Sequence, residues 1–325
     1  MDRHLMSLGI NHAEISPLDR LSYIGDFGMG ALSYEPVRED KKALIADIVL
    51  DDLAESSQVI LRGSSETLLD ELLSLNASSA GARPKIMVQM SDNGKEIIHG
   101  SQSLKHGFSH WMIKFASASD SVDIGAIEYA YSLMAKEAGL DMPQTLLLEG
   151  EKGRYFACER FDRVGNKRVH MHSVAGMVHA DFRLPCLDYD DLMALTIHLT
   201  KNVQELEKMF RLACFNLFSH NRDDHAKNFS FVLNEQGVWA LSPVYDLTFS
   251  RGPSGEHSTM YLGEGKRPTQ MHLQRLGQKH GIKTTEIIIS EVKSAIDNWR
   301  KFAKKADLSV NMSKNVEQYL NGLTR

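Results

Sequence analysis

The chain has 325 residues, 42% apolar and 24% charged, which is ordinary composition for a globular protein of about two domains. Its formal net charge of −5 argues against direct binding of nucleic acid through a large basic surface. Cys158, Cys186 and Cys214 lie far apart without C-x-x-C spacing, which predicts neither disulfides nor a zinc site and favours the cytoplasm. No apolar run has the length of a signal peptide core or a membrane span, so neither is expected.

The first eighty residues are predicted to be mainly helical. Apolar residues at helical spacing indicate short helices at 17–25 and 40–54, and a capping sequence at 63–66 opens a third helix that ends near Asn76. A loop of small residues then runs over 77–85.

The next segment is predicted to form a five-stranded antiparallel sheet. Strand-like runs occur at 86–90, 96–98, 110–115, 145–149 and 154–159. Between the third and fourth runs, residues 123–138 have the spacing of a helix that Gly139 caps.

The second half is predicted to be helical with one insertion. Residues 188–219 have helical spacing, the runs 229–233 and 238–241 form a hairpin around 234–237, and helices follow the loop from Arg251 to Thr269. This order predicts a two-lobed α+β fold, with an N-terminal lobe over 1–160 and a helical C-terminal lobe over 161–325.

The spacing of Asp223 and Asn228 is the most specific signal in the chain. Four residues separate them, as in the R-D-x-x-x-x-N catalytic loop of protein kinases, where the aspartate orients a substrate hydroxyl and the asparagine binds magnesium. Asp246 follows after the hairpin, where a second metal-binding aspartate is expected. The hairpin should bring Asn228 and Asp246 together at one end.

Other readings of these residues remain open. Aspartate and asparagine commonly cap turns, and Asp-Asp-His could belong to a metal site of another kind. His220 and His225 lack helical i, i+4 spacing, so a solvated or core histidine is the better reading for both than transition-metal binding. Oxygen ligands at Asn228 and Asp246 favour magnesium.

Candidates for the phosphate-binding parts of a kinase occur in the expected order. Lys114 ends the third strand and Glu128 lies in the next helix, where a glutamate would pair with that lysine. The 77–85 loop, with small residues and Lys85, could bind phosphates, and the run 159–163 could present backbone groups to adenine. Each has a non-functional alternative. Lys114 could be an exposed lysine at a strand end and Glu128 a solvated charge on a helix. The 77–85 loop could be a flexible connector, and the 159–163 run a solvated turn.

The motif Asn-x-Asp-x-His-Ala-Lys-Asn-Phe-Ser at 221–230 resembles that of the HipA family of bacterial toxin serine/threonine kinases. Tyr245-Asp246, Glu159–Arg163 and Ala80–Lys85 extend the resemblance, which covers residues 18–320 or so. It implies a two-lobed kinase-like fold, ATP and Mg²⁺ as cofactors, and phosphorylation of a seryl or threonyl hydroxyl of a protein. Family members attack aminoacyl-tRNA synthetases and thereby stall translation.

The resemblance also implies roles for individual residues. Asp223 matches the catalytic base and Lys114 the phosphate-binding lysine, while Asn228 and Asp246 match the metal ligands. Ser78 matches an autophosphorylated serine, and Ser79 is its neighbour. The residues expected to contact ATP are Ala80, Gly81, Ala82, Arg83, Pro84, Lys85, Lys114, Glu159, Arg160, Phe161, His225, Lys227, Asn228, Tyr245 and Asp246.

The start of the chain departs from the family pattern. Leu18–Asp26 resembles the end of an N-terminal subdomain, and little precedes it. The chain therefore resembles the shortened, HipT-like toxins of three-component systems, in which a small separate protein supplies the missing part. The expected partners are this small antitoxin, a DNA-binding antitoxin and the protein substrate.

Two other functions use some of the same features. A small-molecule phosphotransferase on a kinase-like scaffold would need the same Asp, Asn and Asp residues. A non-catalytic binding module in a transcriptional autoregulator would be expected to have lost its metal ligands, whereas all of them are present.

Overall fold

The computed structural model describes residues 16–26, 28–37, 83–99, 103–117 and 120–324. The helices predicted at 40–54 and 63–76 lie outside these ranges. The chain forms two compact units: one holds the described residues up to Gly125 together with Gln144–His170, and the other holds Ala126–Pro143 and Met171–Arg325. The sequence-based boundary at residue 160 stays a prediction.

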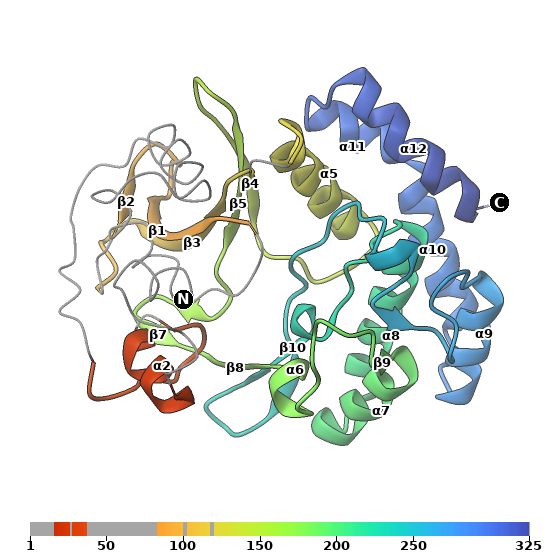
Figure 1. Cartoon of the computed structure of the whole chain (residues 1–325), viewed down its shortest axis with the longest axis horizontal. Coiled ribbons are helices and arrows are strands. Elements are labelled where there is room, and N and C mark those ends of the chain that lie inside the picture. The colour runs from red at the N-terminus through yellow and green to blue at the C-terminus, as the bar shows by residue number, and fades with distance from the viewer. Residues whose placement is uncertain (1–15, 27, 38–82, 100–102, 118–119, 325) are drawn as a thin grey trace. The chain divides into compact units, whose positions relative to one another are not determined.

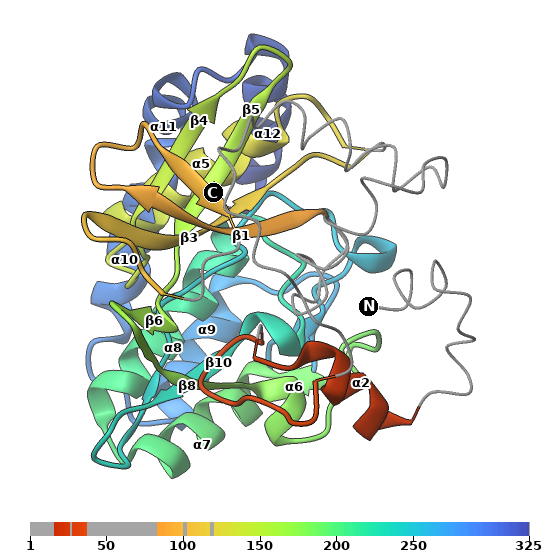
Figure 2. The ribbon, with the colours of Figure 1, turned by 90° about the vertical axis from the view of Figure 1, so that its left-hand side faces the viewer.

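The first unit contains the five-stranded sheet, in the order β2-β1-β3-β5-β4 (Figures 1 and 2). Every neighbouring pair in it is antiparallel, as predicted. The strands are β1 (Lys85–Ser91), β2 (Ile97–His99), β3 (Phe108–Lys114), β4 (Thr145–Glu149) and β5 (Arg154–Glu159).

Alternation along these strands places apolar residues on one face of the sheet. Ile86, Val88 and Met90 of β1 belong to one buried cluster with Trp111 and Ile113 of β3. Because side chains alternate between faces, the intervening residues of β1 and β3 point to the other side. That second face includes both strand-end lysines, Lys85 and Lys114.

An N-terminal helix and two short strands complete the first unit. Helix α2 (Pro17–Ile24) begins with a capping box, in which the Ser16 side chain accepts from Asp19 N at 3.1 Å. Strands β6 (Arg163–Val164) and β7 (Lys167–Arg168) pair antiparallel directly after the sheet.

Helix α5 (Ile124–Glu137) confirms the predicted helix at 123–138. Gly139 has φ 76°, in the left-handed region, and Leu140 N donates to Ala135 O at 3.0 Å, so the chain leaves the helix through a glycine C-cap as expected.

The predicted helical stretch at 188–219 is two helices, α7 (Tyr189–Thr200) and α8 (Val203–Phe218). The break has a local cause. Lys201 adopts the left-handed conformation at the end of α7, and the Asn202 side chain accepts from Gln204 N at 2.9 Å to start α8.

The remaining helices are mostly in the last third of the chain (Figure 1), as predicted. They are α6 (Val174–Met177), α9 (Gln270–Lys279), α10 (Thr285–Asp297), α11 (Trp299–Lys305) and α12 (Val310–Thr324). In the part of the chain that the structure describes, no helix is both long and apolar enough to cross a membrane.

Candidate active site

The predicted hairpin after the catalytic motif is present. Strands β10 (Ser230–Leu233) and β11 (Trp239–Leu241) pair antiparallel, and Gly237 N donates to Asn234 O at 3.0 Å in the turn between them. Strand β8 (His170–Ser173) joins β10 on its other side, which the sequence did not indicate.

Tyr245 fastens the end of this hairpin to the catalytic motif. Its hydroxyl donates to Lys227 O at 2.6 Å and lies 2.5 Å from Ser230 Oγ. Because the single phenolic hydrogen goes to the carbonyl, the serine hydroxyl is the donor in the second contact. Burial raises the pKa of Tyr245, so the phenol stays protonated. These bonds anchor the residue before Asp246 on both sides of Asn228.

Asp246 has an unusual backbone conformation. Its φ is 58°, in the left-handed region that residues other than glycine seldom adopt. Aspartate is among the few side chains that tolerate this region, and such outliers are common at functional sites. The conformation supports a specialised role for Asp246.

The Asn228 side chain is oriented by a hydrogen bond within the motif. Its Nδ2 donates to Asp223 O at 2.7 Å. A carbonyl can only accept, so the amide nitrogen must face it and Oδ1 is turned elsewhere. The amide oxygen of Asn228 and the carboxylate of Asp246 are the ligand types that Mg²⁺ prefers, and the donor set fits the expected metal.

The two adjacent aspartates of the motif have different environments. The Asp223 side chain is 50% exposed, whereas that of Asp224 is fully buried. The Asp224 carboxylate accepts from Ser258 N at 2.8 Å and Thr259 N at 3.2 Å on Oδ1, and from the Tyr189 hydroxyl and His257 Nδ1, both at 3.0 Å, on Oδ2. Asp223 is thus the aspartate available to a substrate, while Asp224 ties the loop to the core.

The network behind Asp224 continues into α8. Asn216 Nδ2 donates to the Tyr189 hydroxyl at 2.8 Å, and Asn221 Nδ2 donates to Asn216 Oδ1 at 2.9 Å. The structural roles of Asp224, Tyr189 and Asn216 were not predictable from the sequence, since nothing in their spacing distinguishes a buried polar side chain from a solvated one.

His225 and Lys227 surround Phe182, a residue of the α6–α7 connection. The Lys227 ammonium lies 3.4 Å from the centroid of the Phe182 ring, and the His225 ring meets it edge-on at 5.8 Å. Burial lowers the pKa of Lys227, and the charge of Arg183 lowers it further. Contact of His225 and Lys227 with ATP stays a prediction.

In the first unit, Lys85 and Lys114 occupy directly opposite positions on β1 and β3. Both side chains are buried, at 7% and 6% exposure, which excludes the exposed reading of Lys114. The Lys114 ammonium also lies 5.6 Å from the Phe156 ring centroid. Two neighbouring cationic side chains suit a polyanionic ligand such as a polyphosphate.

Arg83 has a carboxylate partner within the first unit. Its Nε lies 3.1 Å from Asp120 Oδ2, and Ser117 donates to the same oxygen from N at 2.8 Å and from Oγ at 2.7 Å. Burial opposes ionisation of Asp120, but these hydrogen bonds and the arginine charge outweigh it and lower its pKa. Arg83 therefore anchors the end of the predicted phosphate loop next to Pro84.

Three charged side chains of the run at 159–163, those of Arg160, Asp162 and Arg163, form a largely buried cluster rather than a solvated turn. Asp162, 1% exposed, accepts from Arg160 Nε at 2.9 Å, from Arg163 Nη1 at 2.9 Å and from Gly30 N at 2.7 Å. Arg163 Nη2 also donates to Gly28 O at 3.0 Å. The cluster fixes the segment after α2 to the sheet, and adenine contacts at Glu159, Arg160 and Phe161 stay predictions.

The remaining predicted residues are those of the loop before Arg83, and Glu128. Ser78, Ser79, Ala80, Gly81 and Ala82 lie outside the described residues. Glu128 of α5 is 2% exposed, which excludes a solvated helix charge. Its pairing with Lys114 stays a prediction.

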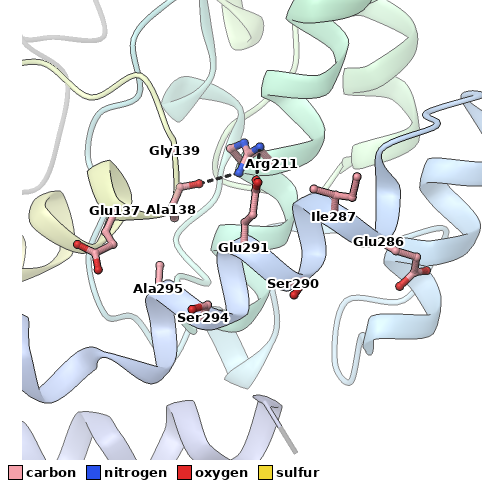
Figure 3. Close-up of a pocket in the computed structure, with 10 residues that line it drawn as sticks. All are labelled: Glu137, Ala138, Gly139, Arg211, Glu286, Ile287, Ser290, Glu291, Ser294 and Ala295. Carbon is pink, nitrogen blue, oxygen red and sulfur yellow. Dashed lines mark hydrogen bonds and ion pairs between the residues drawn. The ribbon is translucent and has the colours of Figure 1, made fainter.

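A groove of about 920 Å³ lies in the second unit and is lined by residues at the end of α5, on α8 and on α10 (Figure 3). Arg211 of α8 projects into it, donates to Ala138 O at 2.9 Å and pairs with Glu291 of α10 at 2.7 Å. None of the predicted site residues lines this groove, and its arginine already bridges α5 and α10. The groove is therefore separate from the set of predicted active-site residues.

Two proteins that are similar in sequence to this chain carry kinase names. The chain is 25% identical over 273 residues to a serine/threonine-protein kinase toxin HipA of Shewanella oneidensis, covering 76% of this chain and 59% of that protein. It is 26% identical over 151 residues to a putative kinase, Y4dM, of Sinorhizobium fredii, covering 42% of this chain and 36% of that protein. It thus spans less than two thirds of either relative.

A solved structure shows the same fold. HipA of Shewanella oneidensis MR-1, in a complex with HipB and operator DNA, superposes with a TM-score of 0.68 at 17% identity, covering 98% of this chain and 79% of that one. This likeness confirms the α+β class, with an N-terminal antiparallel sheet and a helical C-terminal part. The sequence model of one protein family, the HipA-like C-terminal domain, matches residues 77–299, and the chain belongs to this family.

Proposed function

We propose that this chain is a serine/threonine kinase that transfers the γ-phosphate of ATP to a hydroxyl of a protein. The observation that carries the proposal is the catalytic loop: exposed Asp223 stands beside buried Asp224, and Asn228 holds the Asp223 carbonyl at 2.7 Å. This arrangement separates the residue that meets the substrate from the residue that holds the loop.

Each residue has a defined task in the proposed reaction. Asp223 accepts a hydrogen bond from the acceptor hydroxyl and orients its oxygen toward the phosphate. Lys114 and Lys85 bind the phosphates through their ammonium groups. Asn228 and Asp246 would hold Mg²⁺, which when bound supplies positive charge to the phosphate oxygens.

The biological role is proposed from the family. We infer that the chain is a cytoplasmic, HipT-like toxin of a toxin–antitoxin system that phosphorylates an aminoacyl-tRNA synthetase, autophosphorylates Ser78 or Ser79, and is controlled by a small antitoxin and a DNA-binding antitoxin. The name of the Shewanella relative and its complex with HipB support this role. Recovery of both small proteins in a pull-down from the native operon would support the partners, and recovery of neither would contradict them.

The enzymatic proposal is tested with Asp223→Asn and Asp246→Asn variants. Both should lose transfer of labelled phosphate from ATP to lysate proteins and should no longer arrest growth. The control is Asp191→Asn, an exposed aspartate in the first turn of α7, which should keep wild-type activity.

The distribution of the label decides between the proposal and its alternatives. Label on proteins supports a protein kinase, whereas label only on metabolites would establish a small-molecule phosphotransferase. Magnesium-dependent transfer that survived in both Asp variants would overturn the assignment of the active site. No transfer by the wild-type chain would favour a binding module.

A further inference from the structure

Three consecutive backbone carbonyls around Asp223 each accept a hydrogen bond from a side chain. Ser258 Oγ donates to Arg222 O at 3.1 Å, Asn228 Nδ2 donates to Asp223 O at 2.7 Å, and Thr259 Oγ1 donates to Asp224 O. Asn228 belongs to the motif itself, but the two hydroxyls come from a segment more than thirty residues later in the chain. That segment therefore orients the peptide group before Asp223, through Ser258, and the peptide group after Asp224, through Thr259, while Asn228 holds the peptide group between the two aspartates.

The segment that supplies these hydroxyls is itself firmly held. Asp224 Oδ1 accepts both backbone N–H groups, of Ser258 at 2.8 Å and of Thr259 at 3.2 Å. Strand β12 (Thr259–Met260) pairs in parallel with β9 (Leu187–Asp188). Thr259 is fully buried and Ser258 is 8% exposed. The hydroxyls thus have a well-defined position from which to act.

The next turn is anchored in the same way. The Asp188 carboxylate caps α7 and also accepts from Leu262 N at 3.0 Å and from Gly263 N at 2.6 Å. The chain on the C-terminal side of Thr259 is therefore tied to α7 within a few residues. Movement of the two hydroxyls would require breaking the backbone bonds to Asp224 and to Asp188.

These hydroxyls affect Asp223 more than they affect the fold. The backbone N–H groups of 258 and 259 already bind the loop through Asp224, so the hydroxyl bonds add orientation to an attachment that exists without them. The backbone around Asp223 helps to set where its half-exposed carboxylate lies, together with contacts of the side chain such as His225 Nε2, 3.9 Å from Asp223 Oδ1. A displacement of about 1 Å at a catalytic group can cost about a hundredfold in rate.

We propose that Ser258 and Thr259 are positioning residues that set the direction of the Asp223 carboxylate, a role that rests on the proposed kinase function. They bind neither nucleotide nor acceptor in this proposal. Their removal should lower kcat and leave the KM for ATP unchanged, because the nucleotide contacts are not altered.

The test compares three threonine variants of the whole chain. Thr259→Val keeps the shape of the side chain and removes its hydroxyl, and Thr259→Ser restores a hydroxyl. Thr196→Val is the matched control: Thr196 is also fully buried, and its Oγ1 donates to a backbone carbonyl, Leu192 O, at 2.7 Å, within α7. Ser258→Ala provides an independent variant. Transfer of phosphate to a protein acceptor and the melting temperature are measured for each.

We expect Thr259→Val to lower kcat about 10- to 100-fold with less than about a twofold change in the KM for ATP. Thr259→Ser should recover most of the rate, Thr196→Val should keep it, and Ser258→Ala should fall between. Wild-type kcat in Thr259→Val, an equal loss in Thr196→Val, or no recovery in Thr259→Ser would overturn the proposal. Failure of the kinase assignment is distinguishable, because the wild-type chain would then show no transfer at all.

Discussion

Replacement of Asp224 by asparagine should destabilise the second unit, whereas the same replacement at Asp223 should abolish phosphate transfer without destabilising that unit. The two residues are adjacent and chemically identical, so the pair separates burial from catalysis. In the wild type, Asp224 Oδ2 accepts from the Tyr189 hydroxyl and from His257 Nδ1, both at 3.0 Å, and Oδ1 accepts two backbone N–H groups.

The magnitude follows from the atoms that change. In Asp224→Asn the amide oxygen can keep the two backbone donors, but an NH₂ group, which cannot accept, replaces Oδ2. Two hydrogen bonds to a charged group, each contributing about 1.5–3 kcal/mol, are thereby lost. The Tyr189 oxygen and a changed His257 tautomer can accept from the new NH₂, which recovers part of this. We expect a net loss of about 2–4 kcal/mol in the free energy of unfolding.

Thermal and urea unfolding measure this loss. For a unit of this size, it corresponds to a melting temperature lower by about 5–15 °C. Asp223→Asn should remain within about 0.5 kcal/mol of the wild type, as is usual for an exposed substitution, and should show no transfer. An Asp224→Asn protein that melts with the wild type would refute the reasoning, since the buried carboxylate would then not be holding its four donors.

Three further predictions concern other buried groups. Tyr245→Phe removes the hydroxyl bound to Lys227 O, and should destabilise the unit by about 1–2 kcal/mol and raise the Mg²⁺ concentration needed for half-maximal transfer, measured by urea unfolding and by magnesium titration. Burial opposes ionisation of Asp162, but its hydrogen bonds to arginine outweigh this effect and lower its pKa. The ionised carboxylate should therefore stabilise the fold above about pH 4, and this contribution should be lost as the pH falls through the pKa of the folded state. In unfolding experiments, Asp162→Asn should not show this loss of stability in acid. Burial lowers the pKa of His220 to about 4, so the unfolded chain binds a proton at higher pH than the folded chain does. The free energy of unfolding should therefore fall as the pH drops from about 6.5 to 4. Asparagine suits the left-handed backbone of this position, φ 55°, and His220→Asn should flatten the pH dependence of unfolding in that range.

Local patterns predicted the elements of the sheet well. The runs Thr145–Glu149 and Arg154–Glu159 are strands with the predicted bounds, and the 229–241 hairpin has its turn where Asn234 and Gly237 indicated. Alternation and turn chemistry act between near neighbours, so they can be recognised in a single sequence. The break at Lys201 was missed because helical spacing continues on both sides of it.

Contacts between distant segments were not predictable in this way. The run at 159–163 has the composition of a solvated turn, but Asp162 and Arg163 bind the backbone of Gly30 and Gly28, and the charges of Arg160, Asp162 and Arg163 are largely buried. Likewise, the polar residues around Asp224 have no apolar periodicity that would mark them as core. Their burial becomes evident only when the residues that contact them in the folded chain are known.

The sequence by itself determined the kinase-like spacing of Asp223, Asn228 and Asp246, the strand that ends in Lys114 and the α+β class, because each depends on residue type and local spacing. The tertiary structure decided which of the adjacent aspartates is exposed. It did so because the backbone N–H groups of Ser258 and Thr259, with Tyr189 and His257, surround the Asp224 carboxylate and leave that of Asp223 half exposed. Partners so distant in the chain carry no signal in the motif itself.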